Sequence, residues 1–525
     1  MAVQKHFQPF IPDDARVKEF TVKSVIMGAI FGIIFGAATV YLALKAGLTV
    51  SASIPIAVIA ITLGRRFLKT SILENNIIQT TGSAGESVAA GVVFTLPGFL
   101  FLSDPESANF FNYMTILTLA IFGGILGTLM MIPLRRSLIV KEHGVLPYPE
   151  GTACADVLIA GEKGGDFAKT AFWGLGFAFA YALLQKVFHV IAEAPYAMTK
   201  QANKFFPSAR VSGEITPEYL GVGYIIGPKI AGVLVAGGVF AWLVAIPLLA
   251  SLVPAEIIAL QQHKLGYLND LAAAGGRGGW DPVTRTFSDY SAAIYYAYIR
   301  QIGAGAVAAG GFITLIKTIP TIISSFKGSV GSLKKGGEVA ATTAVPRTER
   351  DLNMKVVGIG SLILILLMTV LPQVPGDSIG SKLLLGILVI IFGAFFVTVS
   401  SRIVGLIGSS NNPISGMTIA TLMGTCLIFI AVGWSGKVYE PMALVVGGMI
   451  CIAAANAGAT SQDLKTGYIV GATPKYQQIA LFIGVIVSSI IIGLTVKFLD
   501  TPTAAMLAKN PGMTHAIGST YYPAP

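Results

Sequence analysis

Long stretches without Asp, Glu, Lys or Arg dominate the pattern of hydrophobic and polar positions along the chain. About 20 residues of helix cross the hydrocarbon core of a bilayer, so each long apolar stretch predicts a transmembrane helix. Nine stretches carry no charge at all: Ser24–Leu44, Thr49–Gly64, Phe110–Leu134, Ile230–Ala255, Val356–Gly376, Leu383–Ser401, Ile403–Gly436, Pro441–Gln462 and Tyr476–Val496. Three more contain a few polar residues: Ile77–Leu102, Thr170–Ala192 and Tyr290–Ile316. The pattern predicts an all-α polytopic membrane protein with about twelve transmembrane helices.

The same pattern divides the chain into parts. A polar arm (1–23) precedes a first transmembrane repeat (24–316), which includes a short re-entrant or interfacial element near 146–160. A basic polar loop (317–355) leads into a second, incomplete repeat (356–496) and a C-terminal tail (497–525). An ordinary cytoplasmic loop helix is the alternative for the element near 146–160.

Composition agrees with a membrane protein. Hydrophobic residues make up 54% of the chain and charged residues 12%, about half of the charged share in a soluble protein. The three cysteines lie in apolar context, which predicts neither a disulfide framework nor a metal site. The net charge of +10 is explained by basic cytoplasmic loops, and nothing indicates nucleic-acid binding.

The distribution of Lys and Arg predicts the orientation. Basic residues cluster in the N-terminal arm and again after every second predicted span, whereas the loop Ser103–Asn109 is acidic. This places the N-terminus in the cytoplasm and the chain in the cytoplasmic (inner) membrane. The loop from Lys317 to Lys355 carries seven basic residues, yet the count of spans places it outside. Either a further membrane crossing lies between Val145 and Asp289, or this loop is an exception to the rule that basic loops lie in the cytoplasm.

An internal repeat is the most informative feature. The segment Gly47–Ile56 matches Gly405–Ile414, and Thr81–Gly91 matches Ala457–Gly467 in the same order. Two ordered matches, each next to a span, favour a duplication. Both matched elements are polar, Gly-rich interruptions, and such backbone at membrane depth has to be buried in protein or line a cavity.

The first matched pair predicts a substrate site. Paired broken helices in the two halves of a transporter are the best pointer to its binding site. Hydroxyl groups, amides and a helix end beside Pro413 suit carboxylates and peptide groups. We therefore expect substrate contacts from these residues and from the amide of the second matched pair: Thr49, Ser51, Ser53, Ser409, Ser410, Asn411, Asn412 and Gln462. A structural helix cap formed by Asn411 and Asn412 is the alternative.

Three acidic residues are candidates for proton coupling. Glu86 is the one charged residue of its apolar stretch, Asp463 lies in the matching motif, and Glu150 lies in the short element. Ionisable residues inside a membrane bundle are functional hypotheses by default. The alternatives are that Glu86 lies in water or pairs with Lys45 or Arg402, and that Asp463 forms an ion pair with Lys465.

Four motifs resemble the oligopeptide transporter (OPT) family: Thr80–Pro97, Pro147–Ala155, Ser409–Thr418 and Gln462–Gly467. The resemblance implies proton-coupled symport of peptides, modified peptides or metal–chelate complexes, with about sixteen spans built by duplication. The signatures of the peptide-carrying eukaryotic members are absent, so peptides and siderophore- or nicotianamine-like metal chelates both remain candidate substrates. A channel-like or non-transporting membrane protein is the alternative from another class.

The resemblance has consequences for partners. Because relatives continue beyond the position of residue 525, we expect further helices from a longer chain or from a partner subunit, and a homo-oligomer is a further alternative. No nucleotide-binding, metalloprotease or serine-hydrolase motif is present, so no enzyme activity and no cofactor are predicted.

Overall fold

A computed structural model of the chain describes residues 7–46, 49, 51–163, 167–201, 203, 205–268, 270–303, 305–306, 309–310, 313, 316, 345–509 and 513–517. The chain forms two compact units, which are taken separately below. Unit 1 comprises Met1–Ala171 and Gly311–Pro525, and unit 2 comprises Phe172–Gly310.

The prediction of an all-α polytopic membrane protein is confirmed. Within the described residues, nine segments are long and apolar enough to cross a membrane: Val22–Leu44, Ile72–Phe101, Tyr113–Lys141, Ala231–Leu252, Arg347–Val370, Ile379–Ile407, Ile414–Ala431, Lys437–Val470 and Pro474–Asp500. Two further predicted spans correspond to shorter apolar helices, Ser53–Gly64 and Gly176–Gln185. The predicted span Tyr290–Ile316 is described only in part.

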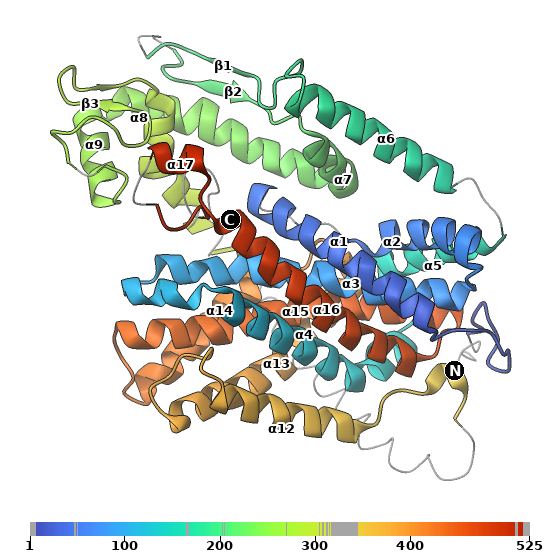
Figure 1. The fold of residues 1–525 in the computed structure, drawn as a ribbon. Coiled ribbons are helices and arrows are strands. Elements are labelled where there is room, and N and C mark those ends of the chain that lie inside the picture. The colour runs from blue at the N-terminus through green and yellow to red at the C-terminus, as the bar shows by residue number, and fades with distance from the viewer. Residues whose placement is uncertain are drawn as a thin grey trace. The chain divides into compact units, whose positions relative to one another are not determined.

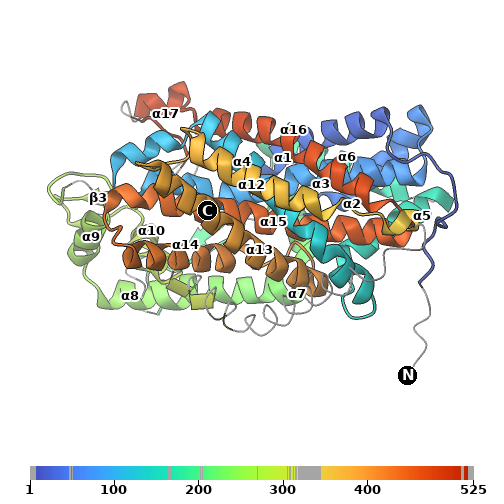
Figure 2. The same ribbon diagram turned by 90° about the horizontal axis from the view of Figure 1, so that it is seen from below.

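Unit 1 is a helical bundle arranged around two long helices, α3 (Ile72–Thr95) and α15 (Glu440–Val470), which contact each other and are buried along most of their length. Seven other helices pack against this pair (Figures 1 and 2). They are α1 (Val22–Ala46), α2 (Ser53–Ile59), α4 (Tyr113–Arg135), α5 (Pro149–Lys163), α13 (Ile379–Ile407), α14 (Ile414–Ala431) and α16 (Pro474–Asp500). The remaining helices of the unit are α12 (Met354–Val370), which packs against α4 and α13, and α17 (Ala504–Lys509). Short π- or 3₁₀-helical segments are η1 (Ala60–Leu68), η2 (Leu96–Phe101), η3 (Pro105–Phe110), η4 (Arg136–Lys141), η7 (Arg347–Glu349) and η8 (Lys437–Tyr439).

Both halves of the repeat show the same order of elements. A long helix (α1 or α13) is followed by a break, a second helix (α2 or α14) and then a buried helix (α3 or α15) that carries the second matched motif. In the second half, α13 continues through Arg402 and ends at Ile407, so the predicted boundary between Ser401 and Ile403 is wrong. Arg402 is tolerated inside the helix because it forms an ion pair with Glu142 at 2.8 Å.

Small residues allow the central helices to approach closely. A Cβ atom built on Gly28 of α1 would lie 2.6 Å from Cβ of Thr81 on α3. A Cβ atom on Gly127 of α4 would lie 2.5 Å from the carbonyl oxygen of Ala453 on α15. Backbones in contact at this distance leave no room for a methyl group, so these glycines are packing positions.

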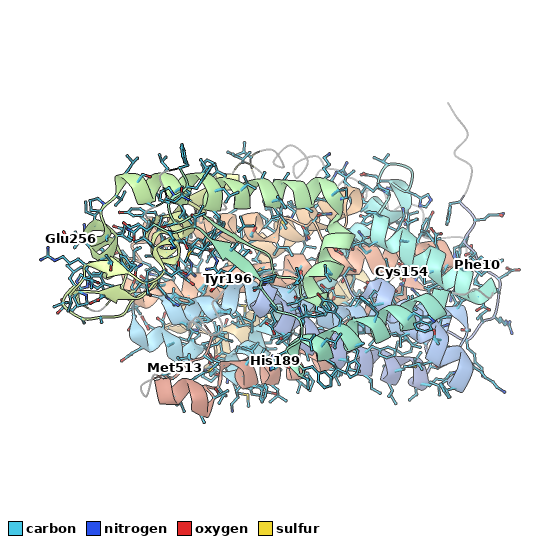
Figure 3. The ribbon with its side chains drawn as sticks, turned by 90° about the horizontal axis from the view of Figure 1, so that it is seen from above. Phe10, Cys154, His189, Tyr196, Glu256 and Met513 are labelled. Carbon is cyan, nitrogen blue, oxygen red and sulfur yellow. The ribbon has the colours of Figure 1, made fainter. Side chains whose placement is uncertain are left out.

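The N-terminal arm is fixed to one end of the bundle. The backbone N–H groups of Phe10 and Ile11 donate to the carbonyl groups of Ile469 and Val470 at 3.0 and 3.1 Å. Phe10 belongs to a hydrophobic cluster with Cys154 of α5 (Figure 3). These contacts close the end of the bundle where α15 ends.

The segment before α12 lies at the same end as the arm. Thr348 donates to Asp13 at 2.5 Å, and Arg347 forms an ion pair with Glu19 at 3.5 Å. Because both segments lie at one end, the chain crosses the bundle an even number of times between them. The end of the basic loop therefore lies on the same side as the arm; residues 317–344 lie outside the described part.

Unit 2 begins within α6 (Phe167–Lys186) and contains helical segments and two short antiparallel hairpins. The hairpins pair Tyr196 with Ser212 and Trp280 with Phe287. The elements are β1 (Tyr196–Met198), β2 (Arg210–Ser212), α7 (Pro217–Val239), η5 (Phe240–Ala245), α8 (Ile246–Leu252), α9 (Ala255–Lys264), β3 (Trp280–Asp281), β4 (Thr286–Phe287), α10 (Tyr290–Ile294) and η6 (Tyr295–Ile299). None of the candidate site residues lies in this unit.

Candidate functional site

A small cavity inside unit 1 lies where the two chain breaks meet. Its wall includes Thr49 and Ser51 from the first break and Ser409 and Ser410 from the second. Glu86 of α3 also lines the cavity. The rest of the wall consists of Ser87, Ala90, Ile414, Ala455 and Ala459. Residues that the repeat and the lone charge singled out separately are thus next to one another.

The cavity is too small for a peptide. Its volume is about 20 Å³, which is room for about one water molecule. The surrounding helices therefore have to move before a larger molecule binds between the breaks.

Glu86 is buried, with 7% of its surface exposed, so the alternative that places it in water is wrong. Among the residues that the structure describes, the charged groups that act on it are two other carboxylates, those of Glu150 and Asp463. The predicted alternative partner Arg402 pairs with Glu142 instead. The side chain of Lys45 lies outside the described residues. Glu86 thus faces the cavity in acidic surroundings.

Asp463 is fully buried on α15 and accepts hydrogen bonds from three side chains. Ser53 donates to its Oδ1 atom at 3.1 Å, Gln79 donates to the same atom, and Ser83 donates to Oδ2. These donors come from the start of α2 and from α3. Asp463 therefore joins the first half of the repeat to the second, and Ser53 is engaged in this network rather than in the wall of the cavity.

Lys465 does not pair with Asp463, so the predicted ion pair is wrong. Its Nζ atom lies 2.9 Å from Nδ1 of His143 and 3.2 Å from the carbonyl oxygen of Leu146, and it lies 5.5 Å from the centre of the Tyr148 ring. Residues two positions apart on a helix do not face each other, which explains the separation.

Glu150 reaches the second break from α5. The backbone turns at Tyr148, whose φ angle is +48°, and Pro149 then begins the helix. The buried Tyr148 donates from its N–H to the carbonyl oxygen of Gly405 at 2.8 Å. Burial also raises the pKa of the Tyr148 hydroxyl, so this group remains a neutral donor, to Ser401 at 3.2 Å.

The carboxylate of Glu150 contacts the break directly. Ser409 donates from its hydroxyl to Oε2, and Ser410 donates from its backbone N–H to Oε1 at 3.0 Å. The three acidic candidates therefore surround one region from three helices, α3, α5 and α15.

The two asparagines do not cap α14, so that alternative is wrong. The N-cap position belongs to Pro413, and no side chain caps the helix. Asn411 is exposed and donates back to the carbonyl oxygen of Ile407 at 3.1 Å. Asn412 donates to Ser400 at 2.8 Å, and its buried Oδ1 atom has no partner within the described residues.

Gln462 joins α5 to α13. Its Oε1 atom accepts from the backbone N–H of Gly151 at 2.6 Å, and its Nε2 atom donates to the carbonyl oxygen of Val404 at 3.1 Å. Gln462 is absent from the cavity wall, so the geometry assigns it to positioning α5, and its predicted substrate contact gains no support.

A family profile described as "OPT oligopeptide transporter protein" matches residues 19–521. The chain belongs to the OPT family. It is 29% identical over 483 residues to a protein of Haemophilus influenzae that carries a provisional name as an oligopeptide transporter, covering 87% of this chain and 69% of that protein. It is also 23% identical over 540 residues to the metal-nicotianamine transporter YSL3 of Arabidopsis thaliana, covering 91% and 71% of the two chains. A relative in Oryza sativa, named probable metal-nicotianamine transporter YSL11, is 22% identical over 541 residues, covering 90% and 68%. This OPT family member is therefore a multi-pass transporter.

Polar residues that the sequence pattern did not indicate hold the acidic groups of this OPT transporter in place. Gln79 and Ser83 bind Asp463, as described above. Asn456 of α15 donates to the carbonyl oxygen of Gly124 at 2.7 Å and to Thr128 at 3.0 Å, and it accepts from Ser87 at 2.9 Å. The presence of amide side chains in otherwise apolar spans could have indicated these residues, because buried polar groups need hydrogen-bond partners.

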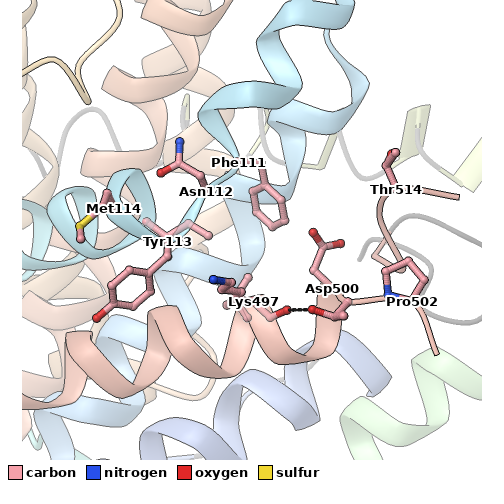
Figure 4. A pocket seen from close by; sticks show the side chains of 11 residues that line it. Phe111, Asn112, Tyr113, Met114, Lys497, Asp500, Pro502 and Thr514 are labelled. Carbon is pink, nitrogen blue, oxygen red and sulfur yellow. Dashed lines mark hydrogen bonds between the residues drawn. The ribbon is translucent and has the colours of Figure 1, made fainter. Parts of the chain in front are cut away.

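A second, larger cavity of about 560 Å³ lies between the start of α4 and the end of α16 (Figure 4). Its wall includes Tyr113, Lys497 and Asp500. The carboxylate of Asp500 is bonded to His515 at 2.6 Å and to the N–H of Ile517 at 3.1 Å. None of the predicted site residues lines this cavity, which lies at the opposite end of α16 from the N-terminal arm.

Proposed function

We propose that this chain is a secondary active transporter that couples the uptake of oligopeptides or peptide-like molecules to protons across the cytoplasmic membrane. Family membership supports transport, and the bacterial relative named for oligopeptides supports this substrate class. The proposal includes the residues of the binding site, the proton as the coupling ion and the cytoplasmic membrane as the location.

The observation that carries the proposal is the cavity between the two breaks. Irregular polar backbone at membrane depth is tolerated where it is buried or lines a cavity, and substrate sites of transporters lie between the corresponding broken helices of two repeats. Thr49 and Ser51 line this cavity together with Ser409 and Ser410. The substrate would bind between them after the helices separate.

The acidic residues around the cavity are the proposed route of the coupling protons. Chains of acidic groups within a helical bundle form proton relays in pumps and transporters. Glu86 lies in the cavity wall, while Asp463 and Glu150 are its acidic neighbours. A proton taken up at Glu86 on one side and released on the other would couple the two fluxes.

Counterflow in proteoliposomes tests the transport proposal. Vesicles preloaded with unlabelled trialanine should take up labelled trialanine faster than empty vesicles. After releasing labelled peptide inside, a carrier binds unlabelled peptide there and returns with it to the outer side, where it can take up label again. Flux that rises linearly with concentration and ignores the internal peptide would identify a channel-like pore and refute the proposal.

A metal chelate is the second candidate substrate, and the plant relatives named for metal-nicotianamine transport favour it. Peptides and amino-acid-like chelators both present carboxylates and amines, so the hydroxyl-lined site suits both. Thermal unfolding of the purified protein with trialanine or with Fe(II)–nicotianamine separates them. A ligand at one hundred times its Kd raises the apparent stability by about 2.7 kcal/mol.

We also propose that the N-terminus lies in the cytoplasm, since the basic arm and the basic segment before α12 lie at one end of unit 1. Labelling of a single cysteine placed at Asp14 in intact cells tests this. Reaction with an impermeant reagent only after lysis is expected, and reaction in intact cells would reverse the orientation. A homo-oligomer or a partner subunit remains a prediction. Light scattering tests it by measuring the molar mass of the purified protein.

A further inference from the structure

The second break holds a carboxylate in this structure, and that carboxylate belongs to the protein itself. Both oxygen atoms of Glu150 are bound, one by the Ser409 hydroxyl and the other by the Ser410 N–H at 3.0 Å. Gly408, with φ of +88°, brings its backbone so close that a Cβ atom there would lie 2.9 Å from Oε1 of Glu150. We call Gly408, Ser409 and Ser410 the carboxylate cradle.

The cradle adjoins both the cavity between the breaks and the side chain of Glu150. Ser409 and Ser410 line the cavity between the breaks. Glu150 is not part of the cavity wall and approaches the cradle from the first turn of α5. The same donors are therefore positioned to bind a carboxylate from α5 or one from a molecule in the cavity, but not both.

Release of Glu150 requires the movement of one side chain only. The backbone beside it is anchored to α15, because Gln462 accepts from Gly151 N–H at 2.6 Å and Thr466 donates to the Gly151 carbonyl oxygen at 2.8 Å. The side chain of Glu150 is partly exposed, so its carboxylate can be hydrated once it leaves the cradle. Neither a loss of α5 packing nor a buried unpaired charge opposes the exchange.

We propose that the carboxylate cradle is the subsite for the free carboxylate of the transported molecule, and that Glu150 occupies it as a built-in competitor. This inference rests on the proposed function and adds the chemical group that is recognised. An incoming carboxylate takes over the bonds from Ser409 and Ser410. Glu86, which also lines the cavity, suits a protonated amine of the same molecule. The ligand class is an amino acid derivative with a free carboxylate, which includes peptides and amino-carboxylate chelators.

Chemical rescue tests the cradle without any knowledge of the natural substrate. Glu150→Ala empties the cradle, lowers the thermal stability of the purified full chain and leaves room for a small anion. Sodium acetate should restore at least half of the lost melting temperature, whereas acetamide and sodium chloride should not. Acetate should have no such effect on Glu150→Ala combined with Ser409→Ala. The matched control is Asp156→Ala, because Asp156 is an exposed carboxylate on the same helix.

Binding of larger ligands tests the competition. In the Glu150→Gln variant, the neutral amide competes less well for the donors, so trialanine should bind three- to tenfold more tightly than to the wild type. Trialanine amide, which lacks the carboxylate, should bind at least tenfold more weakly than trialanine, and Ser409→Ala should weaken trialanine binding. Fe(II)–nicotianamine replaces trialanine as the probe if the chelate is the ligand.

The outcomes separate this inference from the proposed function. Rescue by acetate without counterflow of any probe would uphold the cradle and refute the transport proposal. Absence of rescue, or tighter binding of the amide than of the acid, would refute the cradle even in an active transporter. If Glu150→Gln weakens binding as strongly as Ser409→Ala, Glu150 is itself a ligand-binding residue and the competition is refuted. If Glu150→Ala is not recovered as folded protein, the Glu150→Gln and amide measurements decide.

Discussion

The network around Asp463 allows a prediction in which two substitutions at one position have different consequences. Three donors converge on this buried carboxylate: Ser53 and Gln79 on Oδ1, and Ser83 on Oδ2. Asp463→Ala leaves Ser53 and Gln79 without an acceptor, whereas Ser83 keeps the carbonyl oxygen of Thr80. A buried donor left without a partner costs about 1–3 kcal/mol, so we expect a loss of about 3 kcal/mol or more.

Asp463→Asn should cost far less, because Asn can keep the same bonds. Its Oδ1 atom still accepts from Ser53 and Gln79. Its Nδ2 group replaces Oδ2 and donates to the Ser83 hydroxyl, which rotates and gives its own proton to the carbonyl oxygen of Thr80, already 3.1 Å away. We expect a change within about 1 kcal/mol of wild type.

Thermal unfolding in detergent, read by size-exclusion chromatography after heating, measures the difference. At roughly 2 °C per kcal/mol for a large chain, Asp463→Ala should lower the midpoint by about 6 °C or more and Asp463→Asn by about 2 °C or less. Asp377→Ala is the control, because Asp377 is exposed, and it should not shift the midpoint. Equal losses for Ala and Asn would show that the charge, and not the hydrogen-bond geometry, stabilises the site, and would refute this reasoning.

Two further predictions concern packing and pH. Gly127→Ala should destabilise the protein by about 1–3 kcal/mol, because the new methyl group would lie 2.5 Å from the carbonyl oxygen of Ala453. The control is Gly174→Ala, where a Cβ atom has nothing within 4 Å, and it should be neutral or stabilising in the same melting assay. Equal losses in stability for the two variants would contradict the close approach of the helices. Burial and the nearby Lys465 lower the pKa of His143 below its ordinary value of 6.5. The unfolded chain therefore binds a proton first as the pH falls, so stability should be lost below about pH 6.5. Melting curves from pH 8 to 5 should show less of this loss in His143→Gln, and identical curves would contradict the assignment.

The hydrophobic pattern predicted the spans because a charge inside lipid is costly wherever it has no partner. That rule failed at Arg402, where an ion pair with Glu142 allows α13 to continue. The sequence could not indicate this pair, since Glu142 lies 260 residues away. Helix boundaries that depend on such distant partners cannot be predicted from local composition.

The candidate site was predicted in part. Matching of the two segments indicated polar residues that line one cavity, because the broken helices of transporter repeats lie together at the substrate site. The roles of Asn411, Asn412 and Gln462 depend on which backbone groups lie within reach, and a local pattern does not contain that information. The donors Gln79 and Ser83 were missed for the same reason, since they lie about 380 residues before Asp463 on a different helix.

The most direct test of proton-coupled transport is the accumulation of substrate in proteoliposomes under an imposed pH gradient. Glu86→Gln keeps the shape and hydrogen-bonding capacity of the side chain but cannot take up a proton. We expect this variant to lose gradient-driven accumulation of trialanine while counterflow at equal pH persists, and we expect the exposed control Glu106→Gln to match the wild type. Undiminished accumulation by Glu86→Gln under the gradient would contradict the role of Glu86 in coupling.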